Sequence, residues 1–456
     1  MPSLDDLHRE ARLLERAHRK GDPAAFERVA PWRPDARKAL KDAGAQMVVA
    51  REHGFASWAK LREWVERHPG EYAFHTDMEY YEGRATGLLE SARDGTPSAA
   101  AGFEAEGVEL DEAGARTVVA RRHGFPSWSS LGRHARALDE SGDPFRRAYV
   151  ALEAGDVDGV RAILERFPEL ARVSGTNGNA LINMASTVDM VALLLDAGAA
   201  IDHPNAHGWT PLHQAAYRDD ADLARFLLER DAPADVSARG AGGTPLVVAL
   251  FWGHRSVTAA LAAAGRLPDN LRVAAGLGDV ARIAELVPTP GAPTDAAGAL
   301  RGFYRPHGGF PAWAPSDDPQ EILDEALSWA ARSGRVEAIE ALVALGADAS
   351  ADVYRGTALT WAAAVDRADA ITALVSLGAD VDQRATFGGP DHGDGVTALH
   401  IAAQAGNARA VDALLSASAD PSLRDALHHG TASGWARQGG HTALAERLAR
   451  PGETSA

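Results

Sequence analysis

Side chains suited to acid–base chemistry gather in segment 288–319 of this 456-residue sequence. The segment holds Tyr304 and His307 and, a short way on, the carboxylates Asp317 and Asp318. An imidazole titrates near neutral pH and a neighbouring carboxylate can orient it, so His307 with either aspartate is chemically sufficient for general acid–base catalysis. The Tyr304 hydroxyl would be a second proton donor. These four residues form the candidate catalytic set, should the protein be an enzyme.

The same segment is rich in aromatic residues, which disordered linkers lack. Trp313 is one of them, and Arg305 adds a guanidinium that could hold a carboxylate or phosphate in a two-pronged hydrogen bond. Farther along, Trp329 and Trp361 each directly precede an Ala-Ala pair. We expect these four residues to bind a ligand, with the segment as an ordered lid over an apolar pocket. The alternative is that the two later tryptophans only fill a gap in the core beneath the segment.

A second, shorter segment of the same kind spans residues 386–394. It places His392 between Asp391 and Asp394, and we expect His392 to contribute to ligand binding. The spacing from Asp391 to Gly395 is too short for a calcium-binding loop. Aspartate and glycine are common in tight turns, so a hairpin explains this spacing with fewer assumptions.

Signatures of cofactor and metal chemistry are missing from the sequence. There is no cysteine, which excludes disulfides and thiolate metal sites. There is no phosphate-cradling glycine-rich lysine loop, no His-Glu-x-x-His motif and no Gly-x-Ser-x-Gly elbow. We therefore expect no cofactor and no metal. Any enzyme would be metal-free and nucleotide-free, of the cyclase, isomerase or hydrolase type, working by acid–base catalysis.

The elements that carry these residues follow from a phrase that recurs about every 33 residues. It opens as Thr-Pro-Leu-His-x-Ala-Ala at residues 210–216 and closes as Leu-Val-x-Leu-Gly-Ala-Asp at residues 342–348 and 374–380. Threonine and proline favour a helix start, and paired alanines allow close packing of neighbouring helices. Glycine then permits the left-handed turn that ends the second helix. One such unit cannot bury its apolar face alone, so units must stack.

This phrase resembles the ankyrin repeat, and the resemblance covers most of residues 145–450. It implies an all-α solenoid of about nine units, interrupted by an aromatic insert near residues 290–319. Asp231 and Ser418 stand where the pattern has glycine, which predicts strained or differently shaped turns there.

A different duplication precedes the array. Residues 47–58 match residues 117–128 around the sequence Ala-Arg-x-x-Gly-Phe-x-Ser-Trp. Each copy predicts two helices joined by a turn, with a serine capping the second helix. We expect the tryptophans of the motif, Trp58 and Trp128, to be buried and equivalent. The doublet resembles the amino-terminal region of a group of bacterial ankyrin-repeat proteins.

The doublet divides the amino-terminal part into two helical domains, residues 1–70 and 71–140. The first copy carries a small excess of basic residues, about +3, whereas the whole chain has a net charge of −17. A strongly acidic protein is a poor general binder of nucleic acid, so nucleic acid is an unlikely partner. We rank packing well above DNA recognition for the helix-turn-helix spacing.

The function expected from these patterns is binding. No apolar run is long enough to span a membrane and no leader peptide is recognisable, so we expect a cytoplasmic protein with no membrane partner. The leading hypothesis is an ankyrin-repeat binding protein that recognises a protein or peptide through its concave face and aromatic insert. The alternative is a small-molecule pocket under the insert, either a binding site or the site of a metal-free, nucleotide-free acid–base enzyme.

Overall fold

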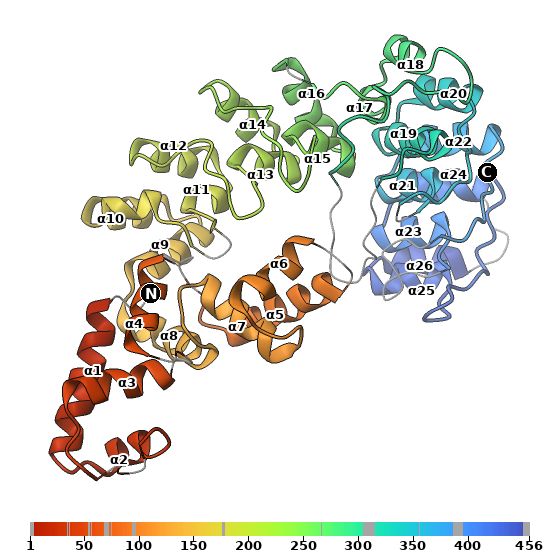
Figure 1. The fold of residues 1–456 in the computed structure, drawn as a ribbon. Helices are drawn as coiled ribbons and strands as arrows, with labels where there is room; N and C mark the ends of the chain where they lie inside the picture. Colours follow the sequence, from red (N-terminus) through yellow and green to blue (C-terminus); the bar gives the residue numbers. More distant parts are fainter. Residues whose placement is uncertain are drawn as a thin grey trace. The chain divides into compact units, whose positions relative to one another are not determined.

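The protein is helical throughout the part of the chain that its structure describes. The computed structural model describes all residues except 1–3, 34, 36, 53–54, 56, 68–72, 74, 94–96, 176–177, 266, 304–314, 355, 386–394 and 450–456. Those described residues form 26 α-helices and no extended strand, which confirms the all-α expectation (Figure 1). Residue contacts divide the chain into two compact units, Met1–Ala200 and Ile201–Ala456.

The first unit begins with two successive groups of four helices. The first group is α1 (Leu4–Arg19), α2 (Pro23–Val29), α3 (Asp42–Glu52) and α4 (Trp58–Arg67), and the second is α5 (Met78–Arg93), α6 (Pro97–Glu106), α7 (Glu112–Arg122) and α8 (Trp128–Ser141). Each group has its own buried core. Helices α1 and α5 are of equal length, as are α3 and α7, so the two groups are built alike.

The motif tryptophans are equivalent but not fully buried. Trp58 and Trp128 are both half-buried and lie against the cores of their own groups, so the expectation of complete burial is wrong. They are the first residues of α4 and α8. The expected serine caps are present, because Ser57 Oγ accepts from the backbone N–H of Lys60 and Ser127 forms a capping box with Ser130.

Short helices complete the first unit. They are α9 (Pro144–Glu153), α10 (Val157–Arg166), a 3-10 turn at Pro168–Arg172, α11 (Leu181–Met184) and α12 (Val188–Asp196). Helix α9 lies directly against the second four-helix group. The His75 ring meets the Tyr149 ring edge-on at 5.7 Å between centroids, and Arg146 Nη2 lies 3.5 Å from the Thr76 hydroxyl.

The second unit consists of helix pairs, each with an inner and an outer helix. They are α13 (Pro211–Tyr217) with α14 (Ala221–Leu228), α15 (Pro245–Trp252) with α16 (Arg255–Ala263), α17 (Leu271–Leu277) with α18 (Val280–Leu286), α19 (Pro319–Ser333) with α20 (Val336–Ala344), α21 (Ala358–Ala364) with α22 (Ala368–Ser376), α23 (Ala398–Ala405) with α24 (Ala408–Ser416), and α25 (Ala432–Gln438) with α26 (Thr442–Ala449). Consecutive inner helices contact one another along the unit. Helix α19 is about twice as long as most of the others, which matters for the site below.

In two of the pairs, α13/α14 and α23/α24, a histidine forms the link to the next pair. The backbone N–H of Thr210 donates to His213 Nδ1 at 3.1 Å, so the ring proton resides on Nε2. That nitrogen then donates to the Gly243 carbonyl at 3.0 Å, in the loop before the next inner helix. His400 repeats this arrangement with Thr397 and the Gly430 carbonyl. The Thr-x-x-His spacing therefore fixes one rung to its neighbour.

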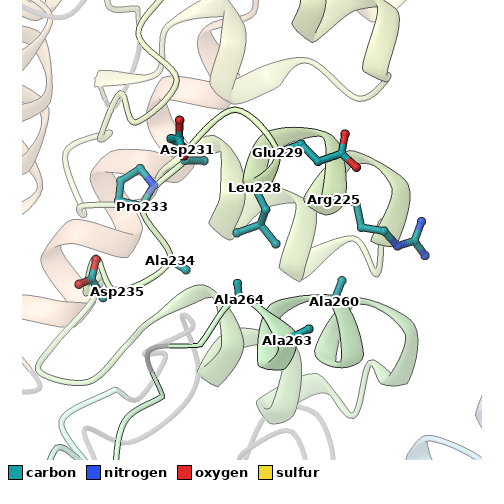
Figure 2. A pocket seen from close by; sticks show the side chains of 11 residues that line it. Arg225, Leu228, Glu229, Asp231, Pro233, Ala234, Asp235, Ala260, Ala263 and Ala264 are labelled. Atoms are coloured by element: carbon teal, nitrogen blue, oxygen red, sulfur yellow. The ribbon is translucent and has the colours of Figure 1, made fainter.

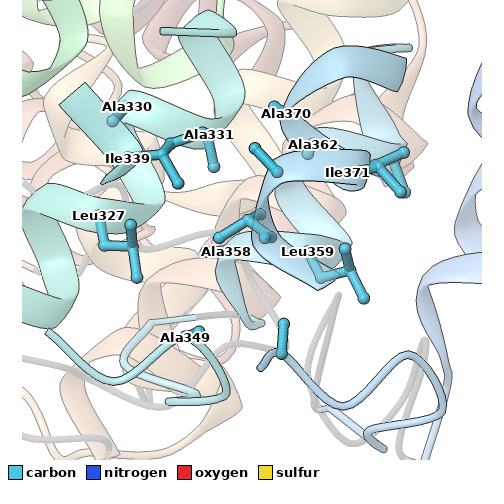
Figure 3. Close-up of a cluster of buried hydrophobic side chains, with 14 of the residues drawn as sticks. Leu327, Ala330, Ala331, Ile339, Ala349, Ala358, Leu359, Ala362, Ala370 and Ile371 are labelled. Atoms are coloured by element: carbon cyan, nitrogen blue, oxygen red, sulfur yellow. The ribbon is translucent and has the colours of Figure 1, made fainter. Parts of the chain in front are cut away.

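Paired alanines let the inner helices approach closely. Ala330, Ala331 and Ala362 are fully buried between neighbouring rungs, and Ile339 and Ile371 of the outer helices close the same core (Figure 3). This core runs without a break from α17 to α26. Burial of apolar surface of this kind is the main driving force for stacking.

The two turns that lack glycine keep the usual shape. Asp231 has φ of 61° and Ser418 has φ of 69°, both in the left-handed region that Gly346 and Gly378 occupy at the same point of their rungs. The expectation of a differently shaped turn is therefore wrong, whereas strain is present, since a side chain in this region costs roughly 1–2 kcal/mol.

Protonation of His213 should destabilise the solenoid in mild acid. Burial lowers the pKa of His213 to about 4, below its ordinary value of 6.5. As pH falls from 6.5 to 4, the unfolded chain takes up this proton and the folded chain does not, so folding stability is lost over that window. The difference corresponds to on the order of 3 kcal/mol.

Urea unfolding at several pH values checks this expectation. His213→Gln should flatten the pH dependence of the unfolding free energy between pH 6.5 and 4 relative to the parent protein. Burial also lowers the pKa of His75, in the first unit, to about 4. The effect of His75→Gln on the same pH dependence is therefore measured for comparison. An unchanged slope in His213→Gln would contradict the assignment.

Candidate functional site

A glycine-rich turn at residues 240–243 lies against residues 300–303, which lead into the aromatic part of the long insert. A Cβ atom at Gly240 would stand 2.0 Å from the carbonyl oxygen of Gly302, and one at Gly242 would stand 2.2 Å from that of Leu300. A Cβ at Gly243 would meet the Phe303 ring at 2.8 Å. The glycines of this turn are therefore what allows residues 300–303 to approach so closely. We call residues 300–303 the insert stem.

The two ends of the insert are clamped together. Arg301 Nη1 donates to the Ser316 carbonyl at 2.7 Å, and Arg301 Nη2 donates to Glu321 at 2.9 Å. The backbone N–H of Ser316 also donates to Glu321 at 2.8 Å, and so does its hydroxyl. One guanidinium and one carboxylate thus close the loop at its base, on the first turn of α19.

A buried ion network continues from this clamp. Glu325 accepts from Arg272 Nη1 at 3.0 Å on one oxygen and from Arg301 Nε on the other. All three side chains are almost inaccessible, at 2%, 1% and 4% exposure for Glu325, Arg272 and Arg301. Arg272 also donates to the carbonyls of Leu300 and Arg301, which secures the stem. Loss of the Glu325 charge would take a counter-charge from two buried arginines, and loss of the arginine charges would leave Glu325 buried without one.

The next turns of α19 carry an aromatic and guanidinium stack. Trp329 and Trp361 are buried, at 1% and 2% exposure, and both rings meet the Phe251 ring at an angle. The Arg332 guanidinium carbon lies 3.7 Å from the centroid of Trp361 and 5.5 Å from that of Trp329. Arg272 covers Trp329 from another direction at 4.7 Å. Desolvated cation–π contacts of this kind contribute about 2 kcal/mol each.

Side chains that precede the outer helices bond the backbone carbonyl groups at the ends of inner helices. In most rungs the residue before the outer helix donates to the preceding inner helix. Thus His254 bonds the Tyr217 carbonyl, Arg335 that of Gly276, Arg367 that of Arg332 and Asn407 that of Ala363. In α18 the corresponding residue is Asp279, which instead caps its own helix through the N–H of Arg282. It cannot donate to the end of α15.

Residues from farther along the chain take over this role at α15. Arg332 Nη1 donates to the Phe251 carbonyl at 2.9 Å and Arg367 Nη2 donates to the Gly253 carbonyl at 2.5 Å. In return, Arg255 at the start of α16 donates to the carbonyl of Ser333 at the end of α19. Helix pair α15/α16 is thereby joined to α19 and α21, beyond its immediate neighbour. Burial, together with nearby Arg255, lowers the pKa of Arg367.

The sequence candidates fall into two groups. Tyr304, Arg305, His307, Trp313 and His392 lie outside the described residues. Of the remainder, Trp329 and Trp361 are brought together in the stack. Asp318 is exposed and caps α19 by accepting from the backbone N–H of Gln320 at 3.0 Å, and Asp317 beside it is exposed as well.

Sequence reasoning missed the charged residues of the site. Arg272, Arg332 and Glu325 stand on inner helices, and arginine or glutamate in a helical pattern normally indicates a solvated face. One signal was available, because Arg332 follows the Ala330-Ala331 pair that marks the buried face of the rung. Another carboxylate nearby, Asp324, accepts from the Asp348 N–H at 2.6 Å, and burial raises the pKa of Asp324.

The described residues include no candidate metal site and no candidate membrane span. No group of three or more histidine, aspartate or glutamate side chains among them is arranged to hold a metal ion. None of the helices in that part of the chain is long and apolar enough to cross a membrane.

Comparison with known families identifies the repeats. A three-copy ankyrin-repeat model matches residues 148–240, 180–270 and 315–385, and a single-repeat model matches residues 394–426. These segments are ankyrin repeats. The array resumes in the match at 315, on the far side of the insert. Ankyrin repeats are protein–protein interaction modules, which places the protein in that broad functional class.

A short stretch of the chain is also similar to a curated protein. It is 46% identical over 50 residues to the ankyrin repeat, SAM and basic leucine zipper domain-containing protein 1 of Equus caballus. The match covers 11% of this chain and 10% of the horse protein. The likeness therefore concerns a small part of each protein.

Neutralising Glu325 should destabilise the ankyrin array strongly. Glu325→Gln keeps the shape of the side chain but removes the carboxylate that two buried guanidiniums share, with Glu321 still paired to Arg301. We expect a loss of about 3–5 kcal/mol in unfolding free energy. Glu337→Gln on α20 removes the same charge from an exposed position and should change stability by less than about 0.5 kcal/mol. Urea unfolding measures both. Equal effects of the two substitutions would refute the structural role of the network.

Replacing Gly240 by alanine should displace the insert stem. Gly240 has φ of 118° and its Cβ would collide with the Gly302 carbonyl, whereas Gly378 has φ of 99° and open space around it. Both substitutions carry backbone strain, and only Gly240→Ala adds the collision. We expect Gly240→Ala to cost about 2 kcal/mol more than Gly378→Ala, with faster amide exchange at residues 300–303. Similar costs and unchanged exchange would show that the stem is held elsewhere.

Proposed function

We propose that this ankyrin-repeat protein binds a partner protein or peptide through the face formed by its inner helices and the long insert. The observation that carries the proposal is a pair of accessible aromatic side chains at the ends of adjacent inner helices. Tyr217 of α13 is 37% exposed and Trp252 of α15 is half-buried. Their ring centroids are 5.7 Å apart.

These two rings continue an aromatic strip across the inner helices. Trp209 lies 6.2 Å from Tyr217 between centroids, and Phe251 lies 5.2 Å from Trp252. Tyrosine and tryptophan dominate the binding energy of protein interfaces because they bury a large area at low entropic cost. A strip that runs from half-exposed rings to fully buried ones provides both a contact surface and a rigid base.

The insert extends this surface in the proposal. Arg305 and Trp313 of the long insert and His392 of the shorter one are the predicted contacts with the partner. The Phe251 ring links the two parts, because it contacts Phe303 of the stem as well as the buried Trp329 and Trp361. The clamp at Arg301 supports the same arrangement, because it joins the stem and Ser316 to the first turn of α19.

The small-molecule and acid–base alternative gains nothing from the described residues. Guanidinium groups cover the faces of Trp329 and Trp361. Asp318, one of the aspartates considered as a partner for His307, serves as a helix cap. Protein recognition therefore remains the function that the arrangement supports best.

We further infer that residues 1–141 consist of two copies of one four-helix domain. Buried positions support this inference over a longer stretch than the shared motif. Leu7 corresponds to Tyr81 and Ala25 to Ala99 at an offset of 74, and Val48 corresponds to Val118 at an offset of 70. The second copy is thus four residues shorter before its third helix. Origin in bacteria and a cytoplasmic location remain predictions from the sequence.

Site-specific photocrosslinking tests the proposed binding face. A photoreactive phenylalanine analogue at Tyr217 should crosslink to a protein in extracts of the producing cells, and the same analogue at exposed Val280 of α18 should not. Trp252→Ala should reduce recovery of that crosslinked protein by about tenfold or more, as removal of an interface hot spot does. Crosslinking of equal yield at both positions, or recovery unaffected by Trp252→Ala, would contradict the proposal.

A further inference from the structure

A second candidate surface lies between two outer helices. An open groove of about 750 Å³ runs between α14 and α16 (Figure 2). Its floor is apolar and is formed by Leu228, Pro233, Ala260 and Ala264. A shallower hollow beside the far end of the same two helices shares Arg225 with it. The groove belongs to the outer helices and is separate from the aromatic strip of the inner ones.

Small side chains on α16 create this groove. Ala264 directly precedes the glycine that ends its rung, Gly265. At the same register Leu345 precedes Gly346 and Leu377 precedes Gly378, and both leucines pack against the core of the array. Ala264 is exposed instead and leaves the space unfilled. Two later rungs thus show a leucine that would close the groove, whereas Ala417, before Ser418, is an alanine like Ala264.

The rim of the groove is acidic. Glu229, Asp231 and Asp235 line one side, and Arg225 is the basic residue of the lining. Figure 2 shows these rim carboxylates, Glu229, Asp231 and Asp235. At the far end Asp219, Asp220 and Asp222 line the adjoining hollow. Asp222 already pairs with Arg225, so the net charge of the rim is strongly negative.

We propose that this groove binds a basic amphipathic helix of a partner protein. An apolar side chain of the helix, leucine in size, would fill the space over Ala264 that Leu345 and Leu377 fill in later rungs. Lysine or arginine residues on either side of it would face Glu229, Asp231 and Asp235. Recognition of a helix by an apolar groove with a charged rim is a common mode of peptide binding. This surface is additional to the inner-helix face proposed above and does not depend on it.

The charges decide which segment the groove prefers. An apolar groove alone would accept any amphipathic helix. Three carboxylates at its rim repel an acidic helix and attract a basic one, and such complementarity sets specificity and association rate more than affinity. The attraction should weaken as salt concentration rises, because exposed charges are screened.

A designed peptide tests the proposal with the full chain. The probe is a helical peptide of about 18 residues with leucine at helical spacing and lysine elsewhere, and its counterpart carries glutamate for lysine. Fluorescence anisotropy should show binding of the lysine peptide only, and hydrogen exchange should show protection in α14 and α16. Protection confined to other helices would overturn the proposal.

Filling the groove is the decisive variant. Ala264→Leu places at this exposed position the leucine that two later rungs carry. It should lower affinity for the lysine peptide by about tenfold and leave thermal unfolding unchanged. Tyr217→Ala should leave this affinity unchanged, which separates the two surfaces. Unaltered affinity in Ala264→Leu would overturn the proposal. So would self-association of the parent chain that Ala264→Leu abolishes, since the occupant would then be a second copy.

Charge removal provides a second, matched comparison. Glu229→Gln with Asp231→Asn takes two charges from the rim, and asparagine tolerates the left-handed backbone at that position. Glu337→Gln with Glu340→Gln takes two charges from exposed positions on outer helix α20. The rim pair should weaken binding and reduce its salt dependence, and the α20 pair should not. Equal weakening by both pairs would show diffuse attraction and overturn the proposal.

Discussion

The second unit depends on how the carbonyl groups at the end of α15 are bonded. In four other rungs a histidine, arginine or asparagine from the following rung donates to such carbonyls. Asp279 cannot donate, since it caps its own helix. Buried backbone acceptors without partners are costly, so arginines from two later rungs, Arg332 and Arg367, bond the Phe251 and Gly253 carbonyls. Because aspartate stands at position 279, two arginines connect α15 to α19 and to the turn that follows α21.

Burying these arginines imposes further requirements on the surrounding sequence. Arg332 is enclosed by aromatic rings, which attract a cation without adding another charge. Arg272 and Arg301 share the carboxylate of Glu325, because two buried guanidiniums require a counter-charge. The long helix α19 supplies Glu321, Glu325, Trp329 and Arg332 at helical spacing. A helix of ordinary ankyrin length could not carry both the insert clamp and the aromatic stack.

The sequence predicted the regular part of the fold because local patterns determine it. Thr-x-x-His spacing and the closing glycines fix helix starts and ends within a rung. The buried ion network could not be predicted in this way, since Arg272 and Glu325 are 53 residues apart and each alone looks like a solvent-exposed residue. The turn at Asp231 was misjudged for a related reason, because neighbouring rungs hold it in a left-handed conformation that local preference disfavours.

The same reasoning explains why the outer groove escaped notice in the sequence. Alanine at position 264 fits a helix as well as leucine does, so propensity gives no signal. Comparison with Leu345 and Leu377 at the same register shows which side chain would fill the space, and Ala417 repeats the alanine in one later rung. In a repeat protein each rung is a control for the others, and departures from the register are more informative than the consensus. At Asp279 the departure is met by arginines from later rungs. At Ala264 none of the described residues fills the space, and the residues around it line an open groove.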